Sequence, residues 1–200
     1  MLSKEQVSPE VVKITSDSGL AFFIRFFYLK IVKPDSIVEN AEFFDEEEKD
    51  ILDAALDFAV ELKAVDYLSR CEQSRCGLER KLLNKNFDKK NIENALDYLE
   101  AKNYLSDERF ARAWLNSRRI NHSEGRARLA SELASRGIGK ETAKKTLDEY
   151  FSENSELELC RKAFLKISRN CADAEKIIRR LIARGFSYSM VKMVMLEKSE

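Results

Sequence analysis

The pattern of apolar and polar positions along the chain repeats three times between residues 78 and 195. Each copy has a large apolar residue at its centre, at Phe87, Ile138 and Phe186, so the centres lie 51 and 48 residues apart. Apolar residues also stand nine and five positions before each centre and five and nine positions after it. A spacing of four residues places side chains on one face of a helix. The pattern therefore predicts three copies of a helix, a break and a second helix.

The break in each copy has the residue types of a tight turn. The position before the centre holds a residue that tolerates the left-handed backbone conformation in which helices end: Asn86, Gly137 and Gly185. The position after the centre holds a residue that suits the start of the next helix: Asp88, Gly139 and Ser187. We therefore expect a positive φ before each centre and a new helix after it.

A further helix is predicted before each pair, at residues 64–71, 107–119 and 156–167. In the middle copy, Ser106 is the expected N-cap, and Leu105 and Phe110 are spaced to pack against each other across it. The buried stripe of this helix is expected to contain Phe110, Ala113, Trp114 and Ile120. Each unit is then a three-helix bundle of about fifty residues, and units this small need to pack against one another.

The first 44 residues have a different pattern. Residues 11–15 and 20–29 are rich in β-branched and aromatic residues and flank Ser-Asp-Ser-Gly, which predicts a β-hairpin with a positive φ at Gly19. Ser36 and Glu39 are spaced as a capping box for a short helix, and the acidic residues from Asp45 onward suit the start of a long one. The predicted fold is mainly α. A short N-terminal β-hairpin segment (1–44) precedes three tandem three-helix-bundle repeats (45–103, 104–153 and 154–200) in an elongated arrangement.

The composition agrees with a helix-rich protein and divides the chain by charge. Hydrophobic residues make up 44% of the chain and charged residues 35%, with only 6 Gly and 2 Pro. Residues 1–65 contain 7 basic and 14 acidic residues, whereas residues 66–200 contain 28 and 21. The net charge of zero therefore conceals a basic C-terminal part that could bind phosphates or an acidic partner.

The sequence predicts no membrane span, secretory leader or metal site. The longest apolar run, residues 19–32, is interrupted by Arg25 and Lys30 and is shorter than the roughly 20 apolar residues of a membrane span. A cytoplasmic location is therefore expected. The four cysteines lack the spacing of zinc ligands, and the single histidine, His122, has no suitable neighbour. We expect no metal, no cofactor and no enzyme activity, because nucleophile–base pairs and phosphate-binding glycine loops are missing from the sequence.

The candidate binding residues are basic side chains that recur in the three repeats. Arginine can bind a phosphate or a carboxylate through two hydrogen bonds, and lysine adds charge. The predicted partner- or phosphate-binding residues are Arg75, Arg80, Lys81, Arg126, Arg128, Arg136, Lys144, Lys145, Arg179, Arg180 and Arg184. The alternative interpretation is a solvated helix surface, because exposed charges usually contribute little.

The middle of the chain resembles the RecX family of regulatory proteins. The resemblance rests on Tyr104-Leu105-x-Asp107-x-x-Phe110-Ala111, on Arg118, and on Gly125-x-x-x-Leu129-x-x-Glu132-Leu133-x-x-x-Gly137-Ile138. Residues 183–191 and 67–82 are similar to the family's C-terminal and first-repeat motifs, although Gly77 replaces an acidic residue before the leucine. The resemblance covers about residues 60–197.

This resemblance implies a helical protein that modulates the RecA recombinase. Members of the family bind the RecA filament on single-stranded DNA and inhibit ATP hydrolysis, strand exchange and co-protease activity, which would place this chain in the regulation of DNA repair, recombination and the SOS response. The partner implied is the RecA filament, with weak direct DNA contact, no membrane, and a monomeric chain.

Two other interpretations stay open. The helix–turn–helix pairs could form a stand-alone nucleic-acid-binding module, or a helical adaptor for another protein. The near-neutral pI of about 6.7 counts against strong binding to free DNA, which normally uses a basic surface.

Overall fold

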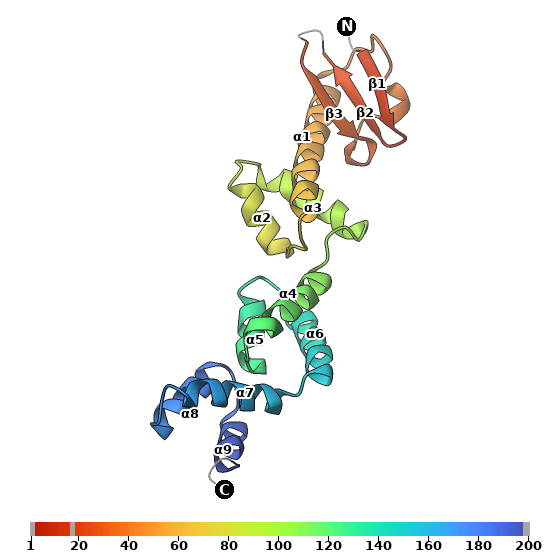
Figure 1. The fold of residues 1–200 in the computed structure, drawn as a ribbon. Helices are drawn as coiled ribbons and strands as arrows, with labels where there is room; N and C mark the ends of the chain where they lie inside the picture. The colour runs from red at the N-terminus through yellow and green to blue at the C-terminus, as the bar shows by residue number, and fades with distance from the viewer. Residues whose placement is uncertain (1–2, 17–18, 198–200) are drawn as a thin grey trace. The chain divides into compact units, whose positions relative to one another are not determined.

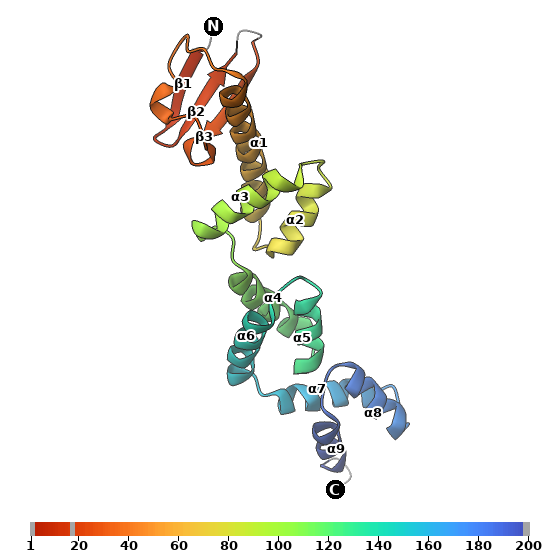
Figure 2. The ribbon, with the colours of Figure 1, turned by 180° about the vertical axis from the view of Figure 1, so that it is seen from behind.

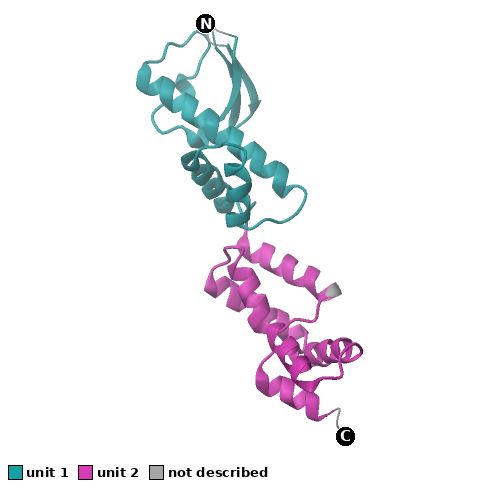
Figure 3. Cartoon of the chain, turned by 90° about the vertical axis from the view of Figure 1, so that its left-hand side faces the viewer, with its two compact units in different colours: residues 1–105 teal, residues 106–200 magenta. Residues whose placement is uncertain are grey.

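The computed structural model describes residues 3–16 and 19–197. The chain divides into two compact units, residues 1–105 and 106–200, which Figure 3 shows in different colours. Each unit has its own cluster of buried apolar side chains. Within the described residues, no helix has the length and apolar character needed to span a membrane.

The first unit opens with a three-stranded antiparallel sheet (Figure 1). Strands β1 (Ser3–Ser8), β2 (Val11–Thr15) and β3 (Ala21–Arg25) are hydrogen-bonded in that order. The predicted hairpin is confirmed as β2 and β3, and Gly19 has the expected positive φ of 80°. Residues 17 and 18 of its turn lie outside the described residues. Strand β1 was not predicted because its side chains are mostly exposed, so it lacks an apolar alternation.

Two local predictions in this segment are wrong. Residues 26–28 form a 3-10 turn (Phe26–Tyr28) rather than the end of a strand. The chain then turns because the backbone N–H groups of Lys30, Ile31 and Val32 all donate to the carboxylate of Asp50, at 2.8–3.0 Å. The capping-box helix after residue 36 is absent. Only a 3-10 turn (Pro34–Ser36) forms, and Asn40 has a φ of 62°, which a helix cannot contain.

The long acidic helix predicted from residue 45 and the helix predicted at 64–71 are one continuous element, α1 (Asp45–Leu68). The sheet lies beside α1, and α3 (Lys89–Ala101) crosses α1 (Figures 1 and 2). Strand residues Val12, Ile14 and Ile24 are fully buried, and they share one core with the apolar side chains of α1, α2 (Arg75–Leu83) and α3. The sheet is thus stabilised by the helices, as a small sheet needs to be.

The second unit contains six helices in its described part: α4 (Asp107–Asn121), α5 (Arg126–Ala134), α6 (Lys140–Glu153), α7 (Glu156–Ser168), α8 (Ala174–Ala183) and α9 (Tyr188–Leu196). One cluster of buried apolar residues extends from Ala111 to Val194, so these helices share a core. Within the unit, α4 packs on α6 and α7 packs on both α8 and α9. The order of elements is therefore that of two consecutive three-helix bundles.

The three predicted turns are confirmed. The φ angles of Asn86, Gly137 and Gly185 are 63°, 81° and 89°. The next helices begin at the expected caps, since Asp88, Gly139 and Ser187 are the N-caps of α3, α6 and α9. Ser106 caps α4, with its Oγ accepting the backbone N–H of Arg109 at 3.3 Å.

The buried stripe predicted for α4 is wrong at two positions. Ala113 is exposed and Ile120 is 78% exposed, whereas Ala111 and Leu115 are buried. Phe110 and Trp114 are partly buried against the core, as predicted. The buried pair Ala111 and Leu115 is one turn apart, so the stripe is shifted round the helix from the face that contains Ala113.

Candidate partner-binding surface

The eleven predicted basic residues lie on α2, α5, α6 and α8 and in the turns that follow α5 and α8. Three of them are in the first unit and eight in the second. Their contacts separate them into three groups. The first group makes contacts that stabilise its own unit, the second forms exposed ion pairs, and the third has no ion pair in the described part of the chain.

Arg75 belongs to the first group. Its guanidinium bonds Oδ1 of Asp97 at 2.7 Å and Oε2 of Glu100 at 2.6 Å, which ties the start of α2 to α3. Partial burial lowers the pKa of Arg75, but the bonded Asp97 and the charge of Glu100 raise it overall. Lys81 donates to Oε1 of Gln73 at 2.8 Å, with its Nζ 5.2 Å from the centre of the Tyr67 ring. Both residues help to hold the first unit together.

Two arginines of α5 and its following turn are bound to aromatic rings. Arg126 pairs with Oδ1 of Asp148 at 2.6 Å and lies 5.0 Å from the centre of the Phe151 ring. Arg136 pairs with Oε2 of Glu132 at 2.7 Å and lies 4.6 Å from the centre of the Trp114 ring. Cation–π contact and ion pairing together give these side chains a structural role in the second unit. Trp114 thus contacts Arg136 and packs partly buried against the core.

Three more residues form exposed ion pairs. Arg128 binds Glu132 at 2.6 Å, Lys145 binds Glu108 at 2.9 Å and Arg179 binds Glu175 at 3.0 Å. The three basic side chains are 48%, 57% and 75% exposed. Such pairs contribute little and exchange readily, so these side chains remain accessible to a partner.

The last group consists of Arg80, Lys144, Arg180 and Arg184. The first three are exposed and Arg184 is half-buried, and among the described residues none of the four has an ion-pair partner. Arg180 and Arg184 are one turn apart at the end of α8. Since their charge is not neutralised within the described chain, these four are the best candidates for binding among the eleven predicted residues.

The sequence analysis missed a basic stripe that runs along α7 to its C-cap, Arg169. Lys162, Lys166 and Arg169 are exposed and lack ion-pair partners in the part of the chain that the structure describes. Their spacing of four and three residues puts them on one face, away from the buried Ala163 and Ile167. That spacing was visible in the sequence, but the repeated turn motif does not include it.

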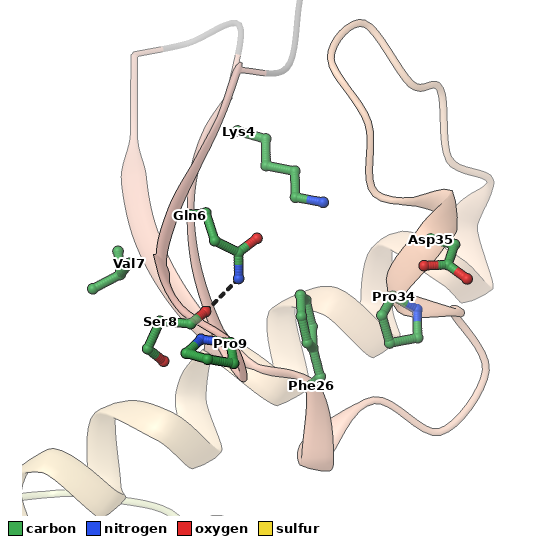
Figure 4. A pocket seen from close by; sticks show the side chains of 8 residues that line it. All are labelled: Lys4, Gln6, Val7, Ser8, Pro9, Phe26, Pro34 and Asp35. Atoms are coloured by element: carbon green, nitrogen blue, oxygen red, sulfur yellow. Dashed lines mark hydrogen bonds between the residues drawn. The ribbon is translucent and has the colours of Figure 1, made fainter.

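A hollow in the first unit contains none of the predicted binding residues. Its volume is about 520 Å³, and its lining combines apolar and polar side chains of β1 with Phe26, Pro34 and Asp35. Figure 4 shows Lys4 extending into the hollow from β1, with Asp35 on the other side.

Within the described residues, no three His, Cys, Asp or Glu side chains are grouped to hold a metal. Burial raises the pKa of the Cys160 thiol to about 11, so it is unreactive.

Three-helix units joined by positive-φ turns place this chain in the class of helical repeat proteins. Two family models match within this chain: "RecX, first three-helix domain" at residues 62–99 and "RecX, second three-helix domain" at residues 106–147. The regulatory protein RecX of Treponema pallidum (strain Nichols) is 35% identical over 143 residues, which cover 72% of this chain and 87% of that protein. RecX of Neisseria meningitidis serogroup C (strain FAM18) is 35% identical over 131 residues, 65% of this chain and 84% of that protein. This chain belongs to the RecX family of regulatory proteins.

Solved structures agree with the fold. A crystal structure of regulatory protein RecX matches with a TM-score of 0.76 at 21% identity and covers all of both chains. The crystal structure of RecX from Lactobacillus salivarius matches with a TM-score of 0.62 at 20% identity, covering 71% of this chain and 96% of that one. The first match covers the whole chain, so it includes the N-terminal sheet as well as the helices.

Proposed function

We propose that this protein binds the RecA filament on single-stranded DNA and lowers the activity of RecA in ATP hydrolysis, strand exchange and co-protease cleavage. Membership of the RecX regulatory family carries this proposal, because the alignment covers 87% of the Treponema relative and the models of the first and second RecX three-helix domains match residues 62–99 and 106–147. The role is regulatory rather than enzymatic, and it belongs to the control of DNA repair, recombination and the SOS response in the cytoplasm.

The distribution of charge supports a filament partner over free DNA. The whole chain has 35 basic and 35 acidic residues, so it has no overall attraction for a polyanion. Many of the basic side chains in the helical units are paired with acids of the same unit. A surface of this kind binds a partner by local complementarity, with a few unpaired cations in contact with phosphate or carboxylate groups.

The direct test is ATP hydrolysis by the host's own recombinase on single-stranded DNA, measured while this protein is titrated into preformed filaments. We expect the steady-state rate to fall as the protein is added and to level off at saturation. A hydrolysis rate that is unchanged at saturating protein contradicts the proposal.

The binding residues can be tested with the unpaired cations. Arg80→Glu, Lys144→Glu and Arg180→Glu each reverse an exposed charge without breaking an ion pair of the described chain. We expect the triple variant to need a higher concentration for half-maximal inhibition, while the control Lys49→Glu, which reverses an exposed lysine outside the predicted binding set, keeps the wild-type value. Reversal of Arg126 and Arg136 is a poorer test because it also breaks their contacts with Phe151 and Trp114. Wild-type inhibition by the triple variant would assign the contact to another surface.

The α7 stripe favours a second candidate, direct binding to nucleic acid. Lys162, Lys166 and Arg169 could contact successive phosphates of a single strand. Binding to a labelled oligonucleotide without recombinase, measured over a range of salt concentrations, decides between the candidates. The slope of log affinity against log salt is about −0.7 for each phosphate contacted on a single strand. Tight binding with a steep slope, together with unchanged ATP hydrolysis, supports the second candidate.

A further inference from the structure

The start of α5 depends on groups that lie far along the chain. Its N-cap is Gly125, which has no side chain to bond the first backbone N–H groups, whereas α4, α7, α8 and α9 are capped by side-chain oxygens of Ser106, Ser155, Asp173 and Ser187. The N–H of Gly125 donates to the carbonyl oxygen of Arg184 at 2.8 Å, and the N–H of Arg126 donates to Oε1 of Glu156 at 2.8 Å. Both acceptors belong to residues 154–200, the third repeat.

Glycine is required at this point because two backbones are in contact. A Cβ on Gly125 would lie 2.4 Å from the carbonyl oxygen of Gly185. A Cβ on Gly185 would lie 2.3 Å from the nitrogen and 2.6 Å from the Cβ of Arg128. Ordinary contacts of a Cβ begin at 3.4 Å, so a methyl group on Gly125 would force the two backbones apart by about 1 Å. The Gly125 N–H bond to Arg184 would then be lost, because it would exceed normal hydrogen-bond length.

The electrostatics of the contact favour the same arrangement. The carboxylate of Glu156 lies at the positive end of the α5 dipole, where a negative charge is stabilising. The neighbouring acid, Glu124, is already bound by Arg118 through two hydrogen bonds of 3.0 and 2.6 Å. It therefore does not compete with Glu156 for the first turn of α5. The third repeat thus supplies the acceptors for the first N–H groups of α5 that the N-cap Gly125 cannot provide.

We propose that Gly125 and Gly185 are positioning residues, which hold the second and third repeats in one fixed arrangement that the partner recognises as a single surface. The contact sets the backbone of Arg128 against that of Gly185, next to Arg184, so the backbone segments that carry basic residues of the two repeats are held together. The arrangement follows from the structure alone, while its role in partner binding rests on the proposed function.

The chain offers a matched pair of variants to test this. Gly125 and Gly139 are both helix N-caps in the extended backbone region, with φ angles of −86° and −61°. A Cβ on Gly139 would find no atom within 4 Å, whereas a Cβ on Gly125 would collide with Gly185. Gly125→Ala therefore separates the repeats, and Gly139→Ala controls for the loss of a glycine cap.

Amide hydrogen exchange of the full-length protein measures the separation directly. In Gly125→Ala we expect the amides of residues 125 and 126 to exchange at least about tenfold faster than in wild type, because both lose acceptors in the third repeat. Circular dichroism should show unchanged helicity. Gly139→Ala should leave these two amides at the wild-type rate. Equal protection in Gly125→Ala and wild type would overturn the proposed coupling.

The role of the two glycines in partner binding is measured in the ATP hydrolysis assay. We expect Gly125→Ala to raise the concentration for half-maximal inhibition about tenfold while the rate at saturation stays at the wild-type level, and Gly139→Ala to behave as wild type. A variant that merely loses folded protein would instead lose helicity in proportion. Wild-type inhibition by a Gly125→Ala protein with fast exchange would overturn the positioning role. If wild type itself does not inhibit, the proposed function fails, and the exchange rates alone still decide whether the glycines hold the repeats together.

Discussion

At the scale of single residues, the first unit depends on a buried ion pair between the sheet and α1. Arg25 donates from Nε and one terminal nitrogen to the two carboxylate oxygens of Glu61, at 2.9 and 2.7 Å, and the hydroxyl of Tyr28 donates to the same carboxylate at 3.0 Å. The side chains of Arg25 and Glu61 are only 17% and 5% exposed. Removal of one partner would leave a buried charge without its counter-ion.

We therefore predict that Arg25→Met destabilises the protein by about 3–5 kcal/mol, the range for breaking a buried ion pair. Urea denaturation followed by circular dichroism measures the change. Arg70→Met is the control, because Arg70 pairs with Asp66 at 2.8 Å but is 67% exposed. A loss no larger than that of the control would show that the Arg25 pair is not a main support of the first unit.

Asp50 gives a prediction about pH. Burial raises the pKa of this carboxyl, but the N–H groups of Val32, Ile31 and Lys30 lower it below the usual value overall. A depressed pKa in the folded state stabilises the protein above the unfolded pKa of about 3.9 and loses that effect as pH falls through the folded value. The stability difference between wild type and Asp50→Asn should therefore be largest near neutral pH and shrink below about pH 4. Denaturation series at several pH values measure it, and a difference that stays constant down to pH 2 would contradict the assignment.

At the scale of elements, the helix ends follow from residue types in the turns. Asn86 occupies the left-handed region with a φ of 63°, where a Cβ without a local hydrogen-bonding group costs about 1–2 kcal/mol. We predict that Asn86→Ala destabilises the first unit by about that amount and that Asn86→Gly changes its stability much less. Chemical denaturation of the two variants compares them at one position. Equal stability of the alanine and glycine variants would mean that the turn relaxes to another conformation.

Elements that depend on local chemistry were predictable, and those that depend on distant contacts were not. The turns at Asn86, Gly137 and Gly185 were foreseen because a positive φ restricts residue type at a single position. Strand β1 was missed because an edge strand needs little apolar surface when β2 provides the pairing. The ion pairs were also invisible, since Arg126 meets Asp148 across 22 positions and Lys145 meets Glu108 across 37.

In the candidate site, too, features set by residue type were predictable and features set by distant contacts were not. Basic residues could be counted in the sequence, but whether each is paired depends on the packing of neighbouring helices. Arg136 and Arg180 illustrate this, because both were predicted as binding residues. The structure places the first on the Trp114 ring and leaves the second exposed, with no ion pair in the described residues. The role of Gly125 was likewise hidden, since its contact is with a residue 60 positions later.

At the scale of the whole molecule, the two separate clusters of buried apolar side chains let us predict which fragments of the chain fold alone. Among the described residues, the buried cluster of the second unit draws on α4 to α9 and includes no side chain of the first unit. We therefore expect a fragment of residues 106–200 to fold cooperatively alone. A fragment of residues 106–153 should be largely unfolded at the same temperature, because it lacks the acceptors Arg184 and Glu156 for α5 and half of its apolar core. Thermal melts of the two fragments by circular dichroism compare them, with full-length protein as the reference for helicity. A fully helical 106–153 fragment with a sharp transition would show that the second repeat is autonomous, and the dependence of α5 on the third repeat would then be a minor contribution to its stability.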